Sequence, residues 1–268
     1  MKTKYLFIML SQLCVIQIAQ AATPQQIPAD LMYQNKPVDS LCFMSQEMNS
    51  EVDLKKCGAS ANKYTTKAMN ADLSKQGYLG YDYEDKSFTP GSHGYSYYKY
   101  YPADNNKYWI YTINNSGGTG QFTTINWVER KNQNTLALHG VVGGDRCNGG
   151  VQDVSEKSGN LTYSVNLTPF DLVELADKNI NVKAYDNLAA CAVCCTAKSF
   201  YTVKTNASPK LDYVELNKVE NVSEMSEQGS IEACFNKLYV SYIQKNSTKL
   251  TQEQLLAFVN QFKQTCVK

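Results

Sequence analysis

The sequence is poor in the residues and motifs that mark the common enzyme classes. It has two arginines, Arg130 and Arg146, and two histidines, His93 and His139. Two histidines cannot build a three-histidine zinc site, and the H-E-x-x-H, G-x-S-x-G, P-loop and dinucleotide-binding motifs are all absent. We therefore assign no catalytic residue, no metal and no cofactor from the sequence, and whether the chain is an enzyme stays open.

An excess of charge of one sign is also lacking. The chain has 26 lysines and arginines against 25 aspartates and glutamates. Such a balanced chain has no field that attracts nucleic acid or an anionic membrane, and arginine, the residue that best grips phosphate, is scarce. We predict that nucleic acid is not a partner.

Long apolar runs are confined to the N-terminus. Two lysines precede an apolar stretch at residues 5–18, and residues 19–21 (Ala-Gln-Ala) have the small side chains that signal peptidase requires. This pattern predicts a secretory signal peptide over residues 1–21, cleaved after Ala21. No later apolar run reaches the roughly 18 residues needed to span a bilayer. We expect a secreted or periplasmic protein with no membrane anchor after signal cleavage.

Cysteine, in contrast, is abundant. The chain has nine cysteines, and eight of them follow the expected cleavage site. An even number in an exported chain predicts a framework of disulfide bonds. The eight cysteines are Cys42, Cys57, Cys147, Cys191, Cys194, Cys195, Cys234 and Cys266.

One pairing follows from the helical pattern near the C-terminus. Residues 231–268 have the apolar spacing of two helices, with a capping box at the start of the second. A short loop near residues 246–250 makes the two helices antiparallel neighbours, which brings Cys234 beside Cys266. We predict a disulfide bond between these two residues.

The other pairings are less constrained. Cys42 and Cys57 are expected to close a helix or helical hairpin, and Cys147 to join one cysteine of the CAVCC cluster, residues 191–195. The cluster also permits a thiol-redox or metal-handling site, because C-x-x-C pairs can be redox-active and clustered thiolates bind zinc or copper. No strand and helix alternation precedes the cluster, so we favour structural disulfides.

The apolar pattern predicts an α+β fold, with an antiparallel β-meander core flanked by an N-terminal helical segment and a C-terminal disulfide-linked helical hairpin. Residues 22–37 are polar and proline-rich and indicate an irregular arm. Residues 38–268 then form a single disulfide-stabilised α+β domain, in which residues 210–268 are a candidate helical sub-domain. The N-terminal helical segment covers residues 38–76.

The strands of the predicted meander are rich in β-branched and aromatic residues. A proline after Thr168 and an acid in the next turn indicate a helix that begins there and runs to about Asp177. Strands are expected at residues 108–113, 121–129, 135–142, 160–168 and 199–205.

Tyrosine is the strongest anomaly of composition, because ten of the 19 tyrosines lie between residues 78 and 111. A tyrosine joins a large apolar ring to a hydrogen-bonding tip and has few torsions to order, so it suits recognition surfaces. The alternative is that these rings cover a sheet edge or pack under a long loop. The candidate binding residues are Tyr95, Tyr97, Tyr98, Tyr100, Tyr101 and His93.

A thiolate site at Cys147, with His139 as base and Asp145 as orienting group, is a further alternative. The glycines of residues 143–150 instead indicate a turn, and a free Cys147 would leave an odd number of cysteines for bonding. We therefore expect Cys147 in a disulfide, and Asp145 and Arg146 as a surface pair.

Three functions follow as hypotheses. The leading one is an exported disulfide-rich binding or interaction module whose ligand is an unknown protein or glycan. The second is a secreted hydrolase without a readable motif. The third is a thiol-redox or metal-handling protein centred on Cys191–Cys195.

Overall fold

The computed structural model has mixed helices and antiparallel sheets, and it describes most of the chain after residue 25. The expected signal peptide, residues 1–21, lies outside the described residues. None of the described helices is long and apolar enough to cross a membrane. The described residues are 26–44, 49–61, 64–66, 70–85, 93–178, 185 and 187–267.

The larger sheet has seven antiparallel strands in the order β3-β9-β8-β7-β6-β5-β4. The expected strands at residues 108–113, 121–129 and 135–142 lie in β7, β8 and β9, where side chains alternate between the two faces. The strands are β3 (Asn49–Asp53), β4 (Tyr64–Thr66), β5 (Leu79–Asp85), β6 (His93–Pro102), β7 (Lys107–Asn115), β8 (Phe122–Asn132) and β9 (Thr135–Asp145).

The second sheet has five antiparallel strands in the order β10-β11-β12-β13-β14, so the expectation of one meander is wrong. The chain leaves the first sheet at the glycine-rich turn after β9, where Arg146 and Gly149 have positive φ angles of 47° and 75°. The expected strands at residues 160–168 and 199–205 therefore belong to the second sheet. Its strands are β10 (Val151–Lys157), β11 (Asn160–Leu167), β12 (Ala197–Val203), β13 (Lys210–Leu216) and β14 (Lys249–Leu250).

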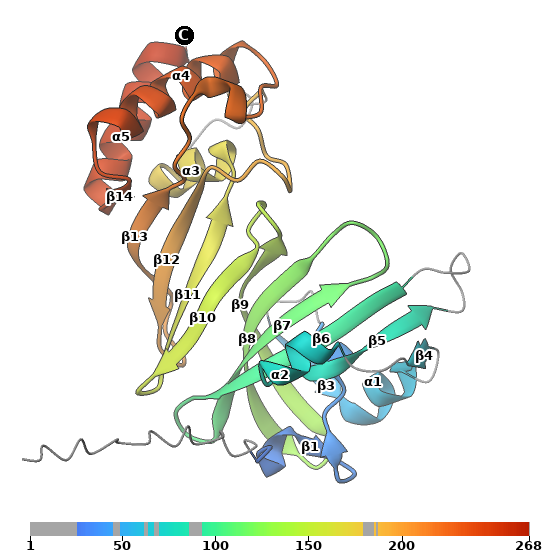
Figure 1. Ribbon diagram of the computed structural model, residues 1–268. Coiled ribbons are helices and arrows are strands. Elements are labelled where there is room, and N and C mark those ends of the chain that lie inside the picture. Colours follow the sequence, from blue (N-terminus) through green and yellow to red (C-terminus); the bar gives the residue numbers. More distant parts are fainter. Residues whose placement is uncertain are drawn as a thin grey trace, which may run out of the picture.

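Three helices, α3 (Pro169–Ala176), α4 (Ser230–Lys245) and α5 (Gln252–Cys266), lie at one end of the five-stranded sheet, away from the seven-stranded sheet (Figure 1). The helix α3 begins after Thr168 with a capping box, and α5 begins with the capping box that the sequence predicts. Cys234 of α4 is bonded to Cys266 at the end of α5, the predicted pair.

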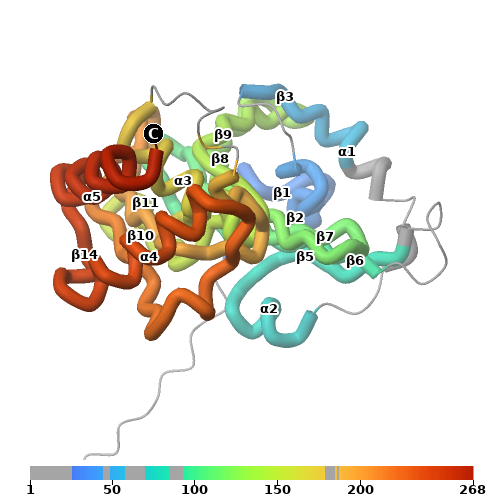
Figure 2. Tube along the Cα trace, turned by 90° about the horizontal axis from the view of Figure 1, so that it is seen from above, coloured from blue at the N-terminus to red at the C-terminus, as the bar shows by residue number. Residues whose placement is uncertain are grey.

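The N-terminal elements differ from the expectation of an irregular arm at residues 22–37 and a helical segment at 38–76. Leu31 is fully buried, because the chain here lies against the first sheet, and strands β3 and β4 interrupt the helices. Figure 2 shows these elements on the side opposite α4 and α5. They are the 3-10 turns η1 (Ala29–Leu31) and η2 (Ser40–Phe43), the strands β1 (Met32–Tyr33) and β2 (Lys36–Pro37), and the helices α1 (Leu54–Ala61) and α2 (Ala71–Lys75).

The seven-stranded sheet has an apolar cluster on each face. On one face, Ile110 and Leu138 pack with Leu31 and Phe43 of the N-terminal elements. On the other face, a larger cluster that includes Trp109 continues through β10 and β11 to the three helices. One core thus joins the two sheets, and residues 210–268 contribute to it through β13, α4 and α5.

Candidate functional site

The tyrosine-rich segment covers β5, β6 and β7, and half of its ten tyrosines are buried while the other half are half-buried. In β6, Tyr97, Tyr98 and Tyr100 have exposed fractions of 0%, 1% and 6%. Tyr95 and Tyr101 are half-buried, and exposed His93 begins the strand. The sheet is covered on both faces here, which is why alternation along the strand exposes neither set of rings. The expected recognition surface is therefore largely part of the interior.

Two tyrosine hydroxyls of this segment bind backbone groups of the second sheet. Tyr111 donates to the carbonyl oxygen of Val151 at 2.9 Å, and Tyr101 donates to that of Val154 at 3.2 Å, both in β10. Burial raises the pKa of Tyr101 and of Tyr111 above the usual value. These rings fasten the first sheet to the edge of the second, which is a structural role.

The second sequence candidate, His139, lies on β9, where its contacts are with Trp127 and Asn49. Its imidazole stacks on Trp127 with ring centroids 3.7 Å apart, and its Nδ1 lies 2.7 Å from Asn49 Oδ1. The Cys147 sulfur is bonded to Cys195, so it cannot act as a nucleophile. The alternative of a Cys147 thiolate site is therefore wrong, and Asp145 instead pairs with Arg146 at 3.0 Å.

The CAVCC cluster holds two of the four disulfides side by side. Cys195 is bonded to Cys147 across 48 residues, and Cys191 is bonded to Cys194 across three. The fourth bond, Cys42 to Cys57, has the expected pairing. We name residues 189–196 the cysteine loop. Among the described residues no group of three histidine, cysteine or acidic side chains is placed to hold a metal ion.

Backbone hydrogen bonds hold the cysteine loop at both ends. The Cys147 N–H donates to the Ala192 carbonyl at 3.2 Å, and the Thr196 N–H donates to the Leu167 carbonyl at 2.8 Å. Asn217 Nδ2 donates to the Cys195 carbonyl at 3.1 Å. The loop is therefore fixed to β11 and to the segment after β13, independently of the Cys191–Cys194 bond.

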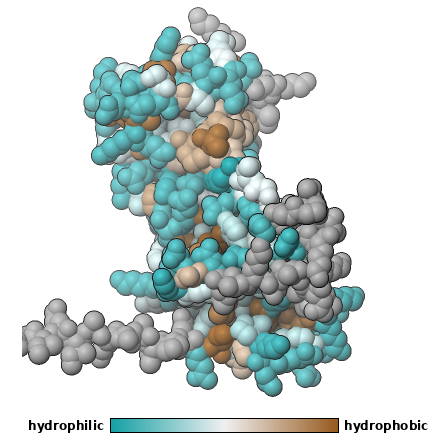
Figure 3. All heavy atoms as spheres, turned by 45° about the vertical axis from the view of Figure 1, so that its right-hand side comes forward, coloured by the Kyte–Doolittle hydropathy of each residue, from teal (hydrophilic) through white to brown (hydrophobic). Residues whose placement is uncertain are grey.

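The tip of the cysteine loop is apolar and open to solvent. Val193 has an exposed fraction of 77%, the highest among the exposed large apolar side chains that the structure describes, whereas Cys194 is only 7% exposed. Cys195 is exposed and Cys191 is half-buried. On the face that Figure 3 shows, the coloured surface is mostly hydrophilic, with small separate apolar patches. An ordered loop thus presents one aliphatic side chain directly beside two disulfides.

A cleft of about 70 Å³ opens next to this tip. It runs between the cysteine loop, α4 and the 3-10 turn η4 (Val222–Glu224). Its exposed lining is more polar than apolar, and Val193 and Met225 are among the apolar side chains. The complete lining is Pro169, Val193, Cys194, Cys195, Thr196, Asn217, Val219, Glu224, Met225, Ser226 and Tyr239.

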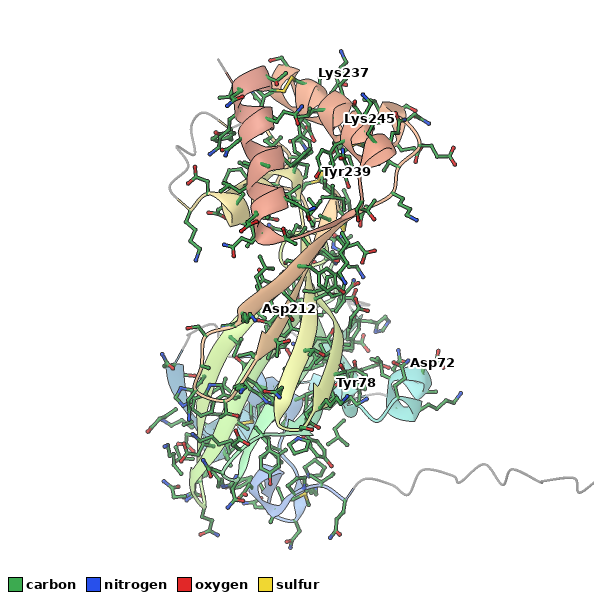
Figure 4. The ribbon with its side chains drawn as sticks, turned by 90° about the vertical axis from the view of Figure 1, so that its left-hand side faces the viewer. Asp72, Tyr78, Asp212, Lys237, Tyr239 and Lys245 are labelled. Carbon is green, nitrogen blue, oxygen red and sulfur yellow. A yellow bond between two sulfur atoms is a disulfide. The ribbon has the colours of Figure 1, made fainter. Side chains whose placement is uncertain are left out.

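Most polar groups of the cleft already have partners. Tyr239 extends from α4 toward the strand ends, whereas Lys237 and Lys245 of the same helix lie on its outer side (Figure 4). The Tyr239 hydroxyl lies 2.6 Å from the Thr196 carbonyl and 2.8 Å from that of Asn217. The Tyr239 hydroxyl therefore fixes the base of the cleft to both neighbouring segments.

Buried polar residues of α4 fix the outer wall of the cleft. Glu232 is fully buried, and its carboxylate accepts bonds from Ser226 Oγ at 2.9 Å and from the Gln228 N–H at 2.6 Å. Asn236, also fully buried, donates to the Ser226 carbonyl at 2.6 Å. Because these bonds hold residues 226–228 on the helix, the wall at Met225 and Ser226 is set by the fold.

A wider hollow of about 490 Å³ lies beside α3. Its charged lining residues are Glu174 of the helix, Lys178 two residues after its end, and Asp171, which is already used in the capping box. No set of polar atoms converges there, so we consider the cleft at the cysteine loop the stronger candidate site.

The sequence drew attention to CAVCC but not to the residues that complete the cleft. Asn217, Met225 and Tyr239 come from two segments with no motif of their own, and only the docking of α4 on the sheet brings them to the loop. Comparisons of this chain with protein-family models, with curated proteins and with solved structures gave no match. The site must therefore be judged from its own chemistry.

Proposed function

We propose that this chain is an exported binding protein that docks another protein through Val193 and the adjoining cleft. The observation that carries the proposal is a fixed loop with a 77% exposed valine at the mouth of a small cleft. Single exposed apolar residues are common on protein surfaces, but here the residue and the cleft form one continuous feature.

The size of the cleft supports a protein partner. Pockets for small molecules usually enclose about 300–1,000 Å³. The volume of about 70 Å³ has room for one small side chain, and the lining residues offer both polar and apolar contact. One projecting side chain of a protein partner suits such a cleft, in the manner of an anchor residue at an interface.

The rigidity of the loop supports the same proposal. Binding costs less when the contacting groups are already ordered. Two disulfides and the backbone bonds of Cys147 and Thr196 hold Val193 in place before any partner arrives. A glycan partner is less well supported, because Tyr97, Tyr98 and Tyr100, which could have stacked on sugars, are buried.

The proposal can be tested with the purified mature protein and a phage-displayed library of random peptides. We expect the selected peptides to share one apolar anchor residue and to bind at least tenfold more weakly to V193D, as measured by fluorescence polarisation. L256D is the matched control, because Leu256 is also an exposed apolar residue, at 43%, but lies on α5. A panel of neutral oligosaccharides is assayed in parallel.

Two results would overturn the proposal. One is equal affinity of the selected peptides for the wild type, V193D and L256D. The other is saturable binding of an oligosaccharide that V193D does not weaken, because this would place the ligand elsewhere and assign it to a different class.

A further inference from the structure

We infer that the Cys191–Cys194 disulfide exchanges with thiols of another protein while the other three disulfides stay closed. The inference goes beyond the proposed docking of Val193 and does not require it. Three observations carry it: the short span of this bond, the bonds that hold the loop without it, and the unequal access to its two cysteines.

The span of the bond makes its contribution to stability small. Cys191 and Cys194 are three residues apart, whereas the other pairs are 15, 48 and 32 residues apart. A disulfide stabilises a fold chiefly by restricting the unfolded chain, and the effect grows with the loop that it closes. The Cys191–Cys194 bond is therefore the one whose opening the fold opposes least.

The loop keeps its place when this bond is open. Cys195, next to Cys194, remains tied to Cys147, and the Cys147 N–H holds the Ala192 carbonyl between the two cysteines. The Cys194 N–H also donates to the Cys191 carbonyl at 3.0 Å. The two thiols of the open form thus stay close together, so the bond can close again without refolding of the chain.

Access to the two cysteines is unequal. Cys191 is half-buried, whereas Cys194 is 7% exposed, so an incoming thiolate reaches Cys191 more readily. Cys195 is also exposed, but the opening of its bond to Cys147 would release the much longer loop of 48 residues. Access and span together single out Cys191 as the point of attack.

The exchange is balanced with a protein or peptide dithiol as the reductant. One thiolate of the dithiol attacks Cys191 Sγ, the Cys191–Cys194 bond breaks, and Cys194 leaves as a thiolate that takes a proton from water. The second thiolate of the dithiol then attacks the dithiol sulfur that is bonded to Cys191 in the mixed disulfide. This step closes the disulfide of the dithiol and releases the Cys191 thiolate, which also takes a proton from water. Two electrons pass to the chain, and the dithiol becomes a disulfide.

The first measurement is the order in which the four disulfides open. The purified mature protein is equilibrated with glutathione at increasing ratios of reduced to oxidised form, alkylated, and mapped by mass spectrometry. We expect Cys191 and Cys194 to be labelled at ratios at which the other six cysteines are unlabelled. Labelling of any other pair first, or of all pairs together, would overturn the inference.

The second measurement is the transfer itself, with a reduced synthetic peptide that contains two cysteines as the probe. We expect the wild type to oxidise one equivalent of peptide and the double variant C191S/C194S to oxidise none. The matched control C42S/C57S, which lacks a distant pair, should oxidise one equivalent if it keeps the wild-type circular dichroism.

Equal oxidation by the wild type and C191S/C194S would contradict the inference, whatever the control shows. V193D separates it from the docking proposal. We expect V193D to retain the opening order and to oxidise the two-cysteine peptide even though it loses the library-selected peptides. If the wild type binds the library-selected peptides but does not oxidise the two-cysteine peptide, the inference is wrong and the proposed function stands.

Discussion

The imidazole of His139 stacks on the indole of Trp127, with ring centroids 3.7 Å apart and the two planes at 14°. Burial, together with the positive charges of Lys131 and Lys107, lowers the pKa of His139 in the folded protein, against the opposite effect of Glu129. In the unfolded chain the imidazole returns to an ordinary pKa of about 6.5. The unfolded state therefore binds more protons than the folded state as the pH falls through that value.

The free energy of unfolding should then decrease as the pH is lowered below about 6.5, and the contribution of His139 should be complete above that pH. Urea unfolding across a pH series measures this slope. We expect H139Q to lose part of this slope. An identical slope in H139Q and the wild type would contradict the prediction.

Two buried tyrosines should respond in opposite ways to the loss of a hydroxyl. The Tyr111 hydroxyl donates to the Val151 carbonyl, so Y111F should lower the free energy of unfolding by about 1–2 kcal/mol. The Tyr98 hydroxyl is buried and has no hydrogen-bond partner among the described residues. Y98F should leave stability unchanged or raise it by about 1 kcal/mol. Equal losses in both variants, measured by urea unfolding, would refute this assignment.

The disulfides should differ in their contribution to stability according to the loops they close. In the chain-entropy model, removal of the Cys234–Cys266 bond, which spans 32 residues, costs about 4 kcal/mol. Removal of the Cys191–Cys194 bond, which spans three residues, costs about 2 kcal/mol. Urea unfolding should show a larger loss in the free energy of unfolding for C234S/C266S than for C191S/C194S. A larger loss for C191S/C194S would contradict the prediction.

The buried carboxylate of Glu232 should be essential to the wall of the cleft. In E232Q the side-chain amide nitrogen can no longer accept a hydrogen bond, so either Ser226 or Gln228 loses its acceptor. We expect a loss of about 1–3 kcal/mol in the free energy of unfolding. E253Q, at an exposed position in the first turn of α5, should change stability by less than about 0.5 kcal/mol. Similar effects of the two substitutions would contradict this role.

The features that the sequence predicts well are local ones. The helix that begins after Thr168 and the disulfide-linked helices joined by Cys234 and Cys266 both follow from caps, apolar spacing and a short loop. The partner of Cys147 could be narrowed only to the CAVCC cluster, because adjacent cysteines such as Cys194 and Cys195 differ in position by a single residue. The fold as a whole sets the direction of each cysteine side chain, and this direction decides whether Cys194 or Cys195 bonds to Cys147.

The features that the sequence missed depend on packing between distant segments. Strand β10 has polar residues at Gln152 and Glu156 and a shift in register, so its alternation is weak. The tyrosines of β6 have the composition of a recognition surface, but only the covering of both faces of the sheet shows that Tyr97 and Tyr98 are interior. Composition alone does not contain that information.

The contacts of β10 also bear on the behaviour of the protein at high concentration. Strand β10 is at the edge of its sheet, where free backbone groups can template the addition of strands from other molecules. At Val151 the N–H is bound by Thr123 Oγ1 at 2.7 Å and the carbonyl by the Tyr111 hydroxyl. The Tyr101 hydroxyl donates a hydrogen bond to the carbonyl oxygen of Val154. The tyrosines of the first sheet thus protect the second from edge-to-edge aggregation.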